Sequence, residues 1–159
     1  MRAIVLWLTL AVALGVVNWQ IVQKEDLAAN GQVVLLQLAP VDPRSLSQGD
    51  YMDLRYALVD TIAVQDIAPD GTLVIQLDGQ QVARYSRLYQ PGTALAANEQ
   101  LLRYHVRTGG VWIGADSFFF EEGQAAVYQN ARYGELRVDS SGNSILVGLR
   151  DNAFKPLGR

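Results

Sequence analysis

The only histidine, His105, is the side chain best suited to acid–base chemistry near neutral pH. In the segment LLRYHVR, strand-like alternation places it beside Arg103 and Arg107 on a basic face, opposite apolar residues. A general base needs an orienting carboxylate and a nearby nucleophile, and the sequence around His105 indicates neither. A lone histidine also lacks the clustering of zinc ligands. We expect a solvated face, with binding of anionic groups by these three residues as the functional alternative.

Nucleophilic catalysis is not expected from the other residue types. The chain has no cysteine, which excludes a thiol nucleophile, a thiolate metal site and a disulfide framework. Ser45 and Ser47 precede a Gly-Asp pair, as the serine of membrane-anchored signal peptidases does, but the only lysines are Lys24 and Lys155. Neither lysine lies in an expected strand, where it could act as a desolvated base.

Paired carboxylates are the remaining candidates for catalysis or cation binding. Asp50 with Asp53, and Glu121 with Glu122, are of the type that glycosidic or general acid–base chemistry requires. Asp116 with Glu121 and Glu122 is a candidate cation site, but the chain has no Asp-x-Asp-x-Asp-Gly loop. Solvated strand edges are the simpler interpretation. We therefore expect no metal site and no cofactor, and we rank a carboxylate-dependent hydrolase last.

The segment FFFEEG carries three consecutive aromatic residues. In a strand, Phe119 must lie on the face opposite Phe118 and Phe120, so at least one aromatic face needs cover. The segment 121–131, whose Ala, Gln and Glu content favours a short helix, is the expected internal cover, and another protein is the alternative. The candidate interaction residues are Tyr51, Phe118, Phe119, Phe120 and Tyr128.

The elements that position these side chains follow an apolar N-terminus. Residues 3–22 carry no charge and make about 30 Å of helix at 1.5 Å per residue, which matches the hydrocarbon core of a bilayer. Arg2 precedes this segment, and the residues Lys24, Glu25 and Asp26 after it are net acidic. The positive-inside bias predicts a cytoplasmic N-terminus, an anchor in the inner (cytoplasmic) membrane and a periplasmic or other extracytoplasmic domain.

A cleaved signal peptide is the alternative to this anchor. The small residues of 11–13 or 13–15 could serve as a cleavage site. The apolar run continues through both positions, and Trp19 lies where an interfacial aromatic residue belongs. We therefore expect an uncleaved signal-anchor.

The rest of the chain has the residue pattern of strands and hairpins. QVVLLQLAP is an apolar, β-branched run that stops at Pro40, and a strand that begins in GDYMDLRY is expected to extend through Val59. Three further strand pairs are predicted from turn residues. Their bends are expected at Asp78-Gly79 as a type I′ turn, at Gly109-Gly110 and at Ser140 to Asn143, while APDGT at 68–72 is expected to be a turn.

Repeated turn signals and few helix formers predict an all-β fold: a mainly antiparallel sandwich or half-open barrel with one short helix, on a single N-terminal transmembrane helix. At 159 residues the chain has room for one such domain. The net charge of −3, from 13 basic and 16 acidic residues, argues against a nucleic-acid surface. The expected organisation is a membrane anchor at 1–24, a linker at 25–31, the β domain at 32–152 and a C-terminal tail at 153–159.

The octet GDYMDLRY at 49–56 combines a turn with the start of a strand. Gly49 allows a backbone conformation that side chains resist, and Asp50 can accept hydrogen bonds from nearby backbone N–H groups. We interpret the octet as a strand entry rather than a reactive site. Its residues resemble the signature G-D-Y-x-x-L-x-Y of the GDYXXLXY family, a group of bacterial membrane-anchored proteins of uncharacterised function. The matching residues are Gly49, Asp50, Tyr51, Leu54 and Tyr56.

The resemblance extends over roughly residues 30–150, through VDPRSLSQ before the octet and through FFFEEGQ and YGELRVDSSGNSILVGL after it. It implies a single N-terminal anchor, an extracytoplasmic domain and genes that tend to neighbour those of multi-spanning membrane proteins. It supplies no catalytic residues.

The sequence therefore favours a non-enzymatic accessory domain that docks on an integral membrane partner or an envelope component. The anchor, the missing catalytic sets and the surplus of aromatic residues support this hypothesis. The alternative is a module that binds a small anionic ligand or an envelope polymer through Arg103, His105 and Arg107.

We expect the substitutions Gly49→Val and Asp50→Ala each to lower the free energy of unfolding by about 1–3 kcal/mol, through backbone strain and unpaired N–H donors respectively. Thermal melts against the parent protein measure the change. An Asp50→Ala variant that melts like the parent but has lost its biological function would show that Asp50 acts at a site.

Overall fold

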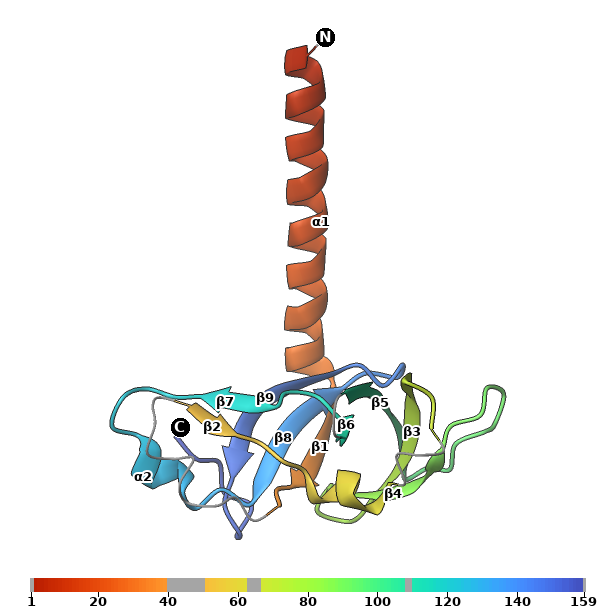
Figure 1. Cartoon of the computed structure of the whole chain (residues 1–159), viewed down its shortest axis with the longest axis vertical. Coiled ribbons are helices and arrows are strands. Elements are labelled where there is room, and N and C mark those ends of the chain that lie inside the picture. Colours follow the sequence, from red (N-terminus) through yellow and green to blue (C-terminus); the bar gives the residue numbers. More distant parts are fainter. Residues whose placement is uncertain (1, 40–50, 63–66, 108–109, 159) are drawn as a thin grey trace.

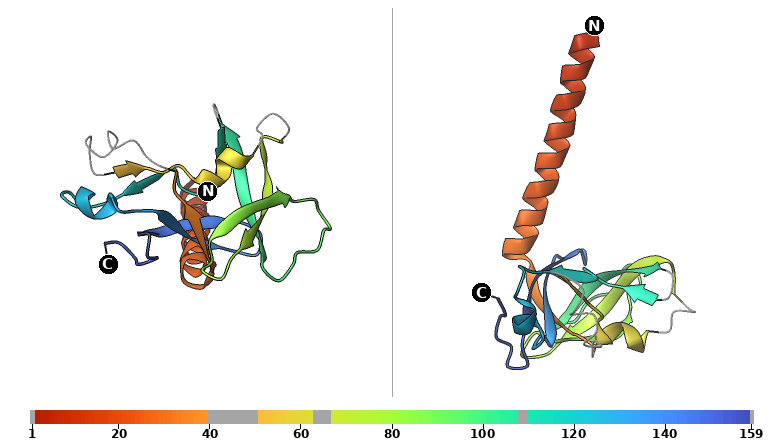
Figure 2. Two further views of the ribbon diagram at one scale, coloured as in Figure 1. Left: turned by 90° about the horizontal axis from the view of Figure 1, so that it is seen from below. Right: turned by 60° about the vertical axis from the view of Figure 1, so that its left-hand side comes forward.

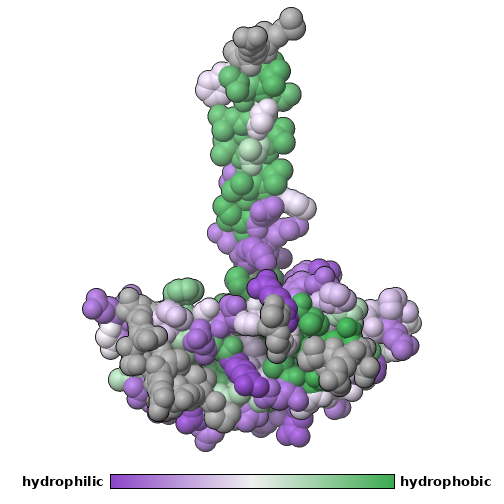
Figure 3. Space-filling model, viewed as in Figure 1, coloured by the Kyte–Doolittle hydropathy of each residue, from purple (hydrophilic) through white to green (hydrophobic). Residues whose placement is uncertain are grey.

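One long helix stands on a β domain (Figure 1). The computed structural model describes residues 2–39, 51–62, 67–107 and 110–158. Helix α1 runs from Arg2 to Asn30, and its stretch Ile4–Asn30 is the one helix in these ranges that is long and apolar enough to cross a membrane. Apolar side chains cover α1 along most of its length, and polar ones gather at its domain end (Figure 3). The apolar window is not buried against the domain, so its surface is open to other molecules.

Helix α1 enters the β domain without a break. Residues 25–30, expected to form most of a linker, continue the helix, which ends where the Gly31 N–H donates to the carbonyl of Leu27 over 2.9 Å. Leu27 is only 8% exposed and so belongs to the domain core. A Cβ atom at Gly31 would lie 2.6 Å from the Leu27 oxygen and 2.9 Å from the Cβ of Arg137. The close approach of helix and sheet therefore requires glycine here.

The domain contains three groups of antiparallel strands. The named strands of the described ranges pair antiparallel, as the hairpin pattern predicts, and one isolated parallel bridge joins Leu35 to Val82. The first sheet has the order β1 (Gln32–Gln37), β8 (Tyr133–Val138), β9 (Ser144–Arg150). The second has the order β4 (Ala83–Leu88), β3 (Asp70–Leu77), β5 (Glu99–Arg107), β6 (Gly110–Trp112). A ribbon of two strands, β2 (Tyr51–Asp53) and β7 (Ser117–Phe119), completes the set.

The two larger sheets curve into a half-open barrel (Figure 2). On one side, the backbone N–H of Leu35 in β1 donates to Gln81, beside the start of β4, over 2.8 Å. On the other side, the N–H of Arg103 in β5 donates to Gly142, in the turn between β8 and β9, over 2.9 Å. The predicted all-β class with a long N-terminal helix is confirmed. Its most deeply buried side chains are aliphatic: Leu36, Leu73, Ile75, Leu102, Leu136, Leu149, Val34, Val74 and Val138.

The hairpin predictions are confirmed in pairing but not in every turn. β8 and β9 form a hairpin whose turn places Gly142 at a positive φ of 84°, where glycine is favoured. β3 and β4 also pair, but the type I′ turn at Asp78-Gly79 is wrong. The Asp78 carboxylate instead accepts the N–H groups of Gln80 and Val82, each over 2.9 Å, and Gln81 takes the positive φ. The Asp78 side chain therefore closes this loop together with a backbone turn, in which the N–H of Gln81 donates to the carbonyl of Asp78 over 3.0 Å.

The motif strand is shorter than predicted. β2 ends at Asp53, and a short 3-10 helix, η2, follows at Ala57–Thr61 instead of a strand through Val59. The turn buries Leu58 and brings Asp60 back to Arg55, with 2.6 Å between carboxylate and guanidinium. The burial of Leu58 outweighs the alternating pattern of the sequence, which predicted that the strand would continue.

One other local prediction is also wrong. Asp70 and Gly71, expected in a turn at 68–72, belong to β3 because they pair with β5. The short helix expected within 121–131 is confirmed as a single turn, α2, at Ala125–Tyr128. Gly109 of the expected Gly109-Gly110 bend lies outside the described residues, although β5 and β6 pair on either side of it.

A buried carboxylate links the first sheet to the end of α1. Glu135 in β8 is 2% exposed and accepts a hydrogen bond from Nε of Arg150 in β9 over 2.8 Å. Nη2 of Arg137 lies 3.8 Å from the same carboxylate, and its Nη1 donates to the carbonyl of Gly31 over 3.3 Å. The paired guanidinium groups offset the cost of burying the charge.

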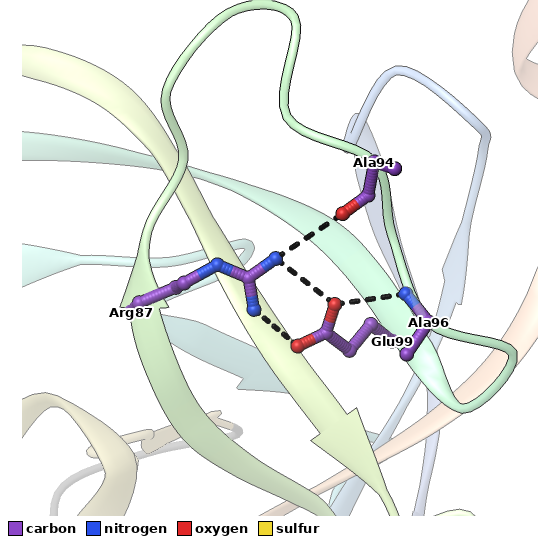
Figure 4. Close-up of polar contacts among 4 residues, drawn as sticks. All are labelled: Arg87, Ala94, Ala96 and Glu99. Carbon is purple, nitrogen blue, oxygen red and sulfur yellow. Dashed lines mark hydrogen bonds and ion pairs between the residues drawn. The ribbon is translucent and has the colours of Figure 1, made fainter.

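A second ion pair closes the loop between β4 and β5 (Figure 4). Arg87 in β4 binds both carboxylate oxygens of Glu99 in β5, with 3.0 Å between Nη2 and Oε2. Oε2 also accepts the backbone N–H of Ala96 over 3.0 Å, and Arg87 reaches the carbonyl of Ala94. The Arg87 guanidinium first, and then the Ala96 N–H, hold the pKa of Glu99 below its usual range. The loop is thus fastened at both of its ends by one carboxylate.

The lowered pKa of Glu99 predicts that the domain loses stability in acid. Because its pKa is lower in the folded chain than in the unfolded one, its contribution is fully present above the unfolded value of about 4.3 and is lost as pH falls through the folded value. We expect a Glu99→Gln variant to be less stable than the parent at neutral pH and to show a smaller decrease of melting temperature in this acid range. Melts in detergent micelles across the pH range measure it.

Asp53→Asn is the matched control, since Asp53 is an exposed carboxylate with no ion pair within the described residues. If Glu99→Gln and the parent lose melting temperature in parallel on acidification, Glu99 does not stabilise the loop as described.

Candidate functional site

The motif divides into buried and exposed side chains. Leu54 and Tyr56 are buried, whereas Tyr51 is 41% exposed on the opposite face of the ribbon. This division agrees with the expected alternation. Gly49 and Asp50 lie outside the described residues, so the turn expected at these two positions stays a prediction.

The tyrosine at the end of the motif has a structural role. Tyr56 donates its hydroxyl to the carbonyl of Ala115 over 2.9 Å, and the N–H of Leu54 donates to the carbonyl of Asp116 over 2.7 Å. Burial, and secondly the negative charge of Asp116, raise the pKa of Tyr56 well above its usual value, so the phenol stays a neutral donor. A Cβ at Gly134 would lie 3.1 Å from the Tyr56 ring, which therefore packs directly on the β8 backbone. Leu54 and Tyr56 fasten the β2 and β7 segments to the barrel.

The other tyrosine of the motif forms an exposed aromatic pair. Tyr51 and Phe119 are cross-strand partners in the ribbon, with ring centroids 5.8 Å apart. Phe119 is 76% exposed, the largest value among the exposed large hydrophobic side chains of the described β domain. β7 lies on the side of the domain from which α1 leaves, and an apolar protrusion stands over it on that side (Figures 1 and 3). We call Tyr51 and Phe119 the aromatic pair.

The other three candidate interaction residues pack against one another within the domain. Phe118 and Phe120 point away from Phe119 and pack on Tyr128 of α2, with ring centroids 5.1 Å and 5.0 Å apart respectively. Tyr128 is itself buried. Of the five candidate interaction residues, only Tyr51 and Phe119 are presented to the surroundings.

The basic face of β5 is largely partnered. Nδ1 of His105 is in hydrogen-bond contact with the carboxylate of Asp70, its partner in β3, and both side chains are exposed. Nε of Arg103 reaches the carbonyl of Ser141 over 3.4 Å. Arg107 is exposed and makes no ion pair with any described residue. An anion would therefore compete with Asp70 for His105.

Sequence reasoning missed Asp70 for a clear reason. The Pro-Asp-Gly signal predicted a turn, and β4 separates β3 from β5 in the chain, so nothing local indicates that Asp70 faces His105. The arrangement supplies a carboxylate next to the histidine, but the described residues place no hydroxyl nucleophile in hydrogen-bond contact with His105. They also contain no group of three or more His, Asp or Glu side chains that could hold a metal ion.

Two hollows accompany these side chains. One, of about 510 Å³, adjoins the motif residues Leu54 and Tyr56 and is also lined by Trp112, Asp116 and the Arg55–Asp60 ion pair. The other is a groove of about 510 Å³ between α1 and β9, which we call the helix groove. Its lining residues are Val17, Gln20, Ile21, Gln23, Lys24, Glu25, Ala28 and Ile145.

Comparison with known proteins agrees with the motif. The model of the family described as GDYXXLXY protein matches residues 13–149, which covers most of the chain. The chain belongs to the GDYXXLXY family. The match begins within α1 and ends in β9, so it covers the later part of the helix and most of the β domain of the GDYXXLXY protein. No curated protein and no solved structure matches the chain.

The two motif tyrosines should respond differently to substitution. We expect Tyr56→Phe to lower the free energy of unfolding by about 1–2 kcal/mol, because it leaves the carbonyl of Ala115 without its donor. Tyr51→Ala should cost less than about 1 kcal/mol, since the side chain is partly exposed and outside the core. Urea unfolding in detergent compares the two variants with the parent. Equal costs would contradict the assignment of Tyr56 to the core and Tyr51 to the surface.

Proposed function

We propose that this GDYXXLXY protein is a non-enzymatic accessory domain, tethered to the cytoplasmic membrane by α1, that docks on an integral membrane protein. The N-terminus lies in the cytoplasm and the β domain on the extracytoplasmic side. The length and apolar surface of α1 support the tether, and Arg2 before the span with the net acidic residues 24–26 after it support the orientation.

The helix groove carries the proposal of a membrane-embedded partner. Val17, Ile21, Lys24 and Ala28 recur at spacings of four, three and four residues and so share one face of α1. Val17 and Ile21 belong to the apolar span, whereas Ala28 follows the first charged residues. Ile145 of β9 borders the same groove from the domain. An occupant must match an apolar surface at bilayer depth and a protein surface just outside it.

A transmembrane helix of a partner protein meets both requirements. The stretch from Val17 to Ala28 is about 17 Å long, or three helical turns, which is a usual length for a helix–helix contact. Gln20 lies in the groove within the apolar segment, and its amide can hydrogen-bond to a neighbouring helix. Within the described residues, the β domain does not bury the apolar part of this face, which lies on the N-terminal side of Ala28.

Site-specific photo-crosslinking in host membranes tests the partner. We expect a photoreactive residue at Ile21 to form an adduct with an integral membrane protein, and the same residue at Val22 to form little. Val22 is the matched control because it lies at the same depth, is exposed and does not line the groove. The substitution Ile145→Ser should reduce the Ile21 adduct while leaving the melting temperature near that of the parent.

The alternatives give different products. An adduct between two copies of the chain would replace the proposed partner by self-association, and adducts with lipid alone would assign the groove to lipid. Equal protein adducts from positions 21 and 22 would contradict the proposed use of the groove.

A further inference from the structure

We infer that the aromatic pair, Tyr51 and Phe119, inserts into the interfacial layer of the lipid bilayer that α1 spans, so that lipid supports the domain at a second point. The inference rests on the proposed membrane tether and is independent of the proposed partner protein. It assigns a role to the tyrosine of the motif that the barrel does not use.

The height of the domain above the bilayer follows from the continuous helix. Val22 is the last apolar residue of the span, and Leu27, already buried in the domain, follows about 7.5 Å further along the helix. The head-group layer of one leaflet is about 5–8 Å thick. The side of the domain that faces α1 therefore begins where the head groups end.

The junction keeps this height fixed. The Gly31 N–H bonds to Leu27, Arg137 holds the Gly31 carbonyl, and a side chain at Gly31 would collide with both neighbours. The described helix contains no glycine or proline between Gly15 and Gly31 that would mark a bend. The domain is thus carried at the end of a rigid rod instead of a flexible linker.

The aromatic pair is on the side that this rod brings to the bilayer. β7 lies on the α1 side of the domain and α2 lies further from α1 (Figure 1). Phe118 and Phe120 pack on Tyr128 of α2, so Phe119, on the opposite face of β7, is turned toward the α1 side. Phe119 is 76% exposed, and Tyr51 supports its ring from the neighbouring strand. Aromatic rings, and tyrosine in particular, partition favourably into the head-group region. Trp19 near the end of the apolar span, 62% exposed, is at a comparable interfacial position on α1.

Lipid fits this surface better than a charged partner does. The charges nearest to the pair in sequence are acidic: Asp50 and Asp53 flank Tyr51, with Asp53 exposed on the same face of β2, and Glu121 follows Phe119. No cationic side chain is among these nearest charges to attract anionic lipid. The contact is therefore expected to depend on apolar insertion and to occur on zwitterionic lipid.

Spin labelling of the full chain in nanodiscs of phosphatidylcholine tests the inference. The chain has no cysteine, so each single-cysteine variant carries one label. We expect a label at Phe119→Cys to be accessible to oxygen and protected from a water-soluble nickel reagent. A label at Asn152→Cys, exposed beyond the end of β9 far from α1, should be open to nickel as in water.

In a second measurement the label is placed at position 51, so that the side chain of Phe119 is retained. A label at Tyr51→Cys should lose its protection from nickel when Phe119→Ser is added, because Phe119 then no longer inserts. The matched control is Phe154→Ser in the same labelled chain, since Phe154 stacks on Tyr133 of β8 and not on either ring of the aromatic pair. This control should leave the protection at position 51 unchanged.

Each outcome decides a separate point. A label at Val12→Cys reports the tether: if it is open to nickel, α1 does not span the bilayer and the proposed function fails with the inference. If position 12 is protected while position 119 is as open as position 152, the inference alone is wrong. Protection of position 119 in native membranes but not in lipid nanodiscs would assign the aromatic pair to a protein partner and overturn the lipid contact.

Discussion

The buried carboxylate of Glu135 is the interaction on which the arrangement of helix and barrel depends. It lies in the central strand of the first sheet, binds Arg150 on one side and approaches Arg137 on the other. Arg137 in turn holds the carbonyl at the end of α1. A buried charge is costly unless its partners are in place. β8, β9 and the end of α1 must therefore assemble together. The direction in which α1 leaves the domain is a result of this assembly.

The aromatic residues have two separate roles that the sequence shows only in part. Alternation predicted that Phe119 opposes Phe118 and Phe120, and that Tyr51 opposes the core residues of the motif, because the period of a strand is two. It could not show that Tyr128 covers one face, since α2 is a single turn whose position depends on the whole barrel. The same limit applies to the contact between Tyr51 and Phe119, which requires β2 to pair with a strand more than sixty residues later.

Local signals predicted the hairpins well but not the details of both turns. The carboxylates of Asp78 and Asp139 each accept the backbone N–H groups two and four residues later, so the two turns are closed in the same way. The third residue after the aspartate takes the positive φ in both, and it is Gly142 in one turn but Gln81 in the other. Asp70 illustrates the cost of relying on local signals: a sequence typical of a turn is a strand because β5 pairs with it, and this pairing creates the contact with His105. The helix beyond residue 24 was likewise underestimated, because its last turns are stabilised by the burial of Leu27 rather than by composition.

Because α1 continues into the domain without a break, the length of α1 determines the orientation of the domain. An α-helix advances by about 100° and 1.5 Å for each residue. One residue added between Val22 and Leu27 would therefore raise the domain only slightly but would turn it by more than a quarter of a circle relative to the apolar part of the helix. Seven added residues would restore the orientation to within about 20° and lift the domain by about 10 Å. In this protein, the number of residues between the apolar part of α1 and Leu27 sets the angle of the domain, and natural insertions in that segment should occur in steps that preserve it.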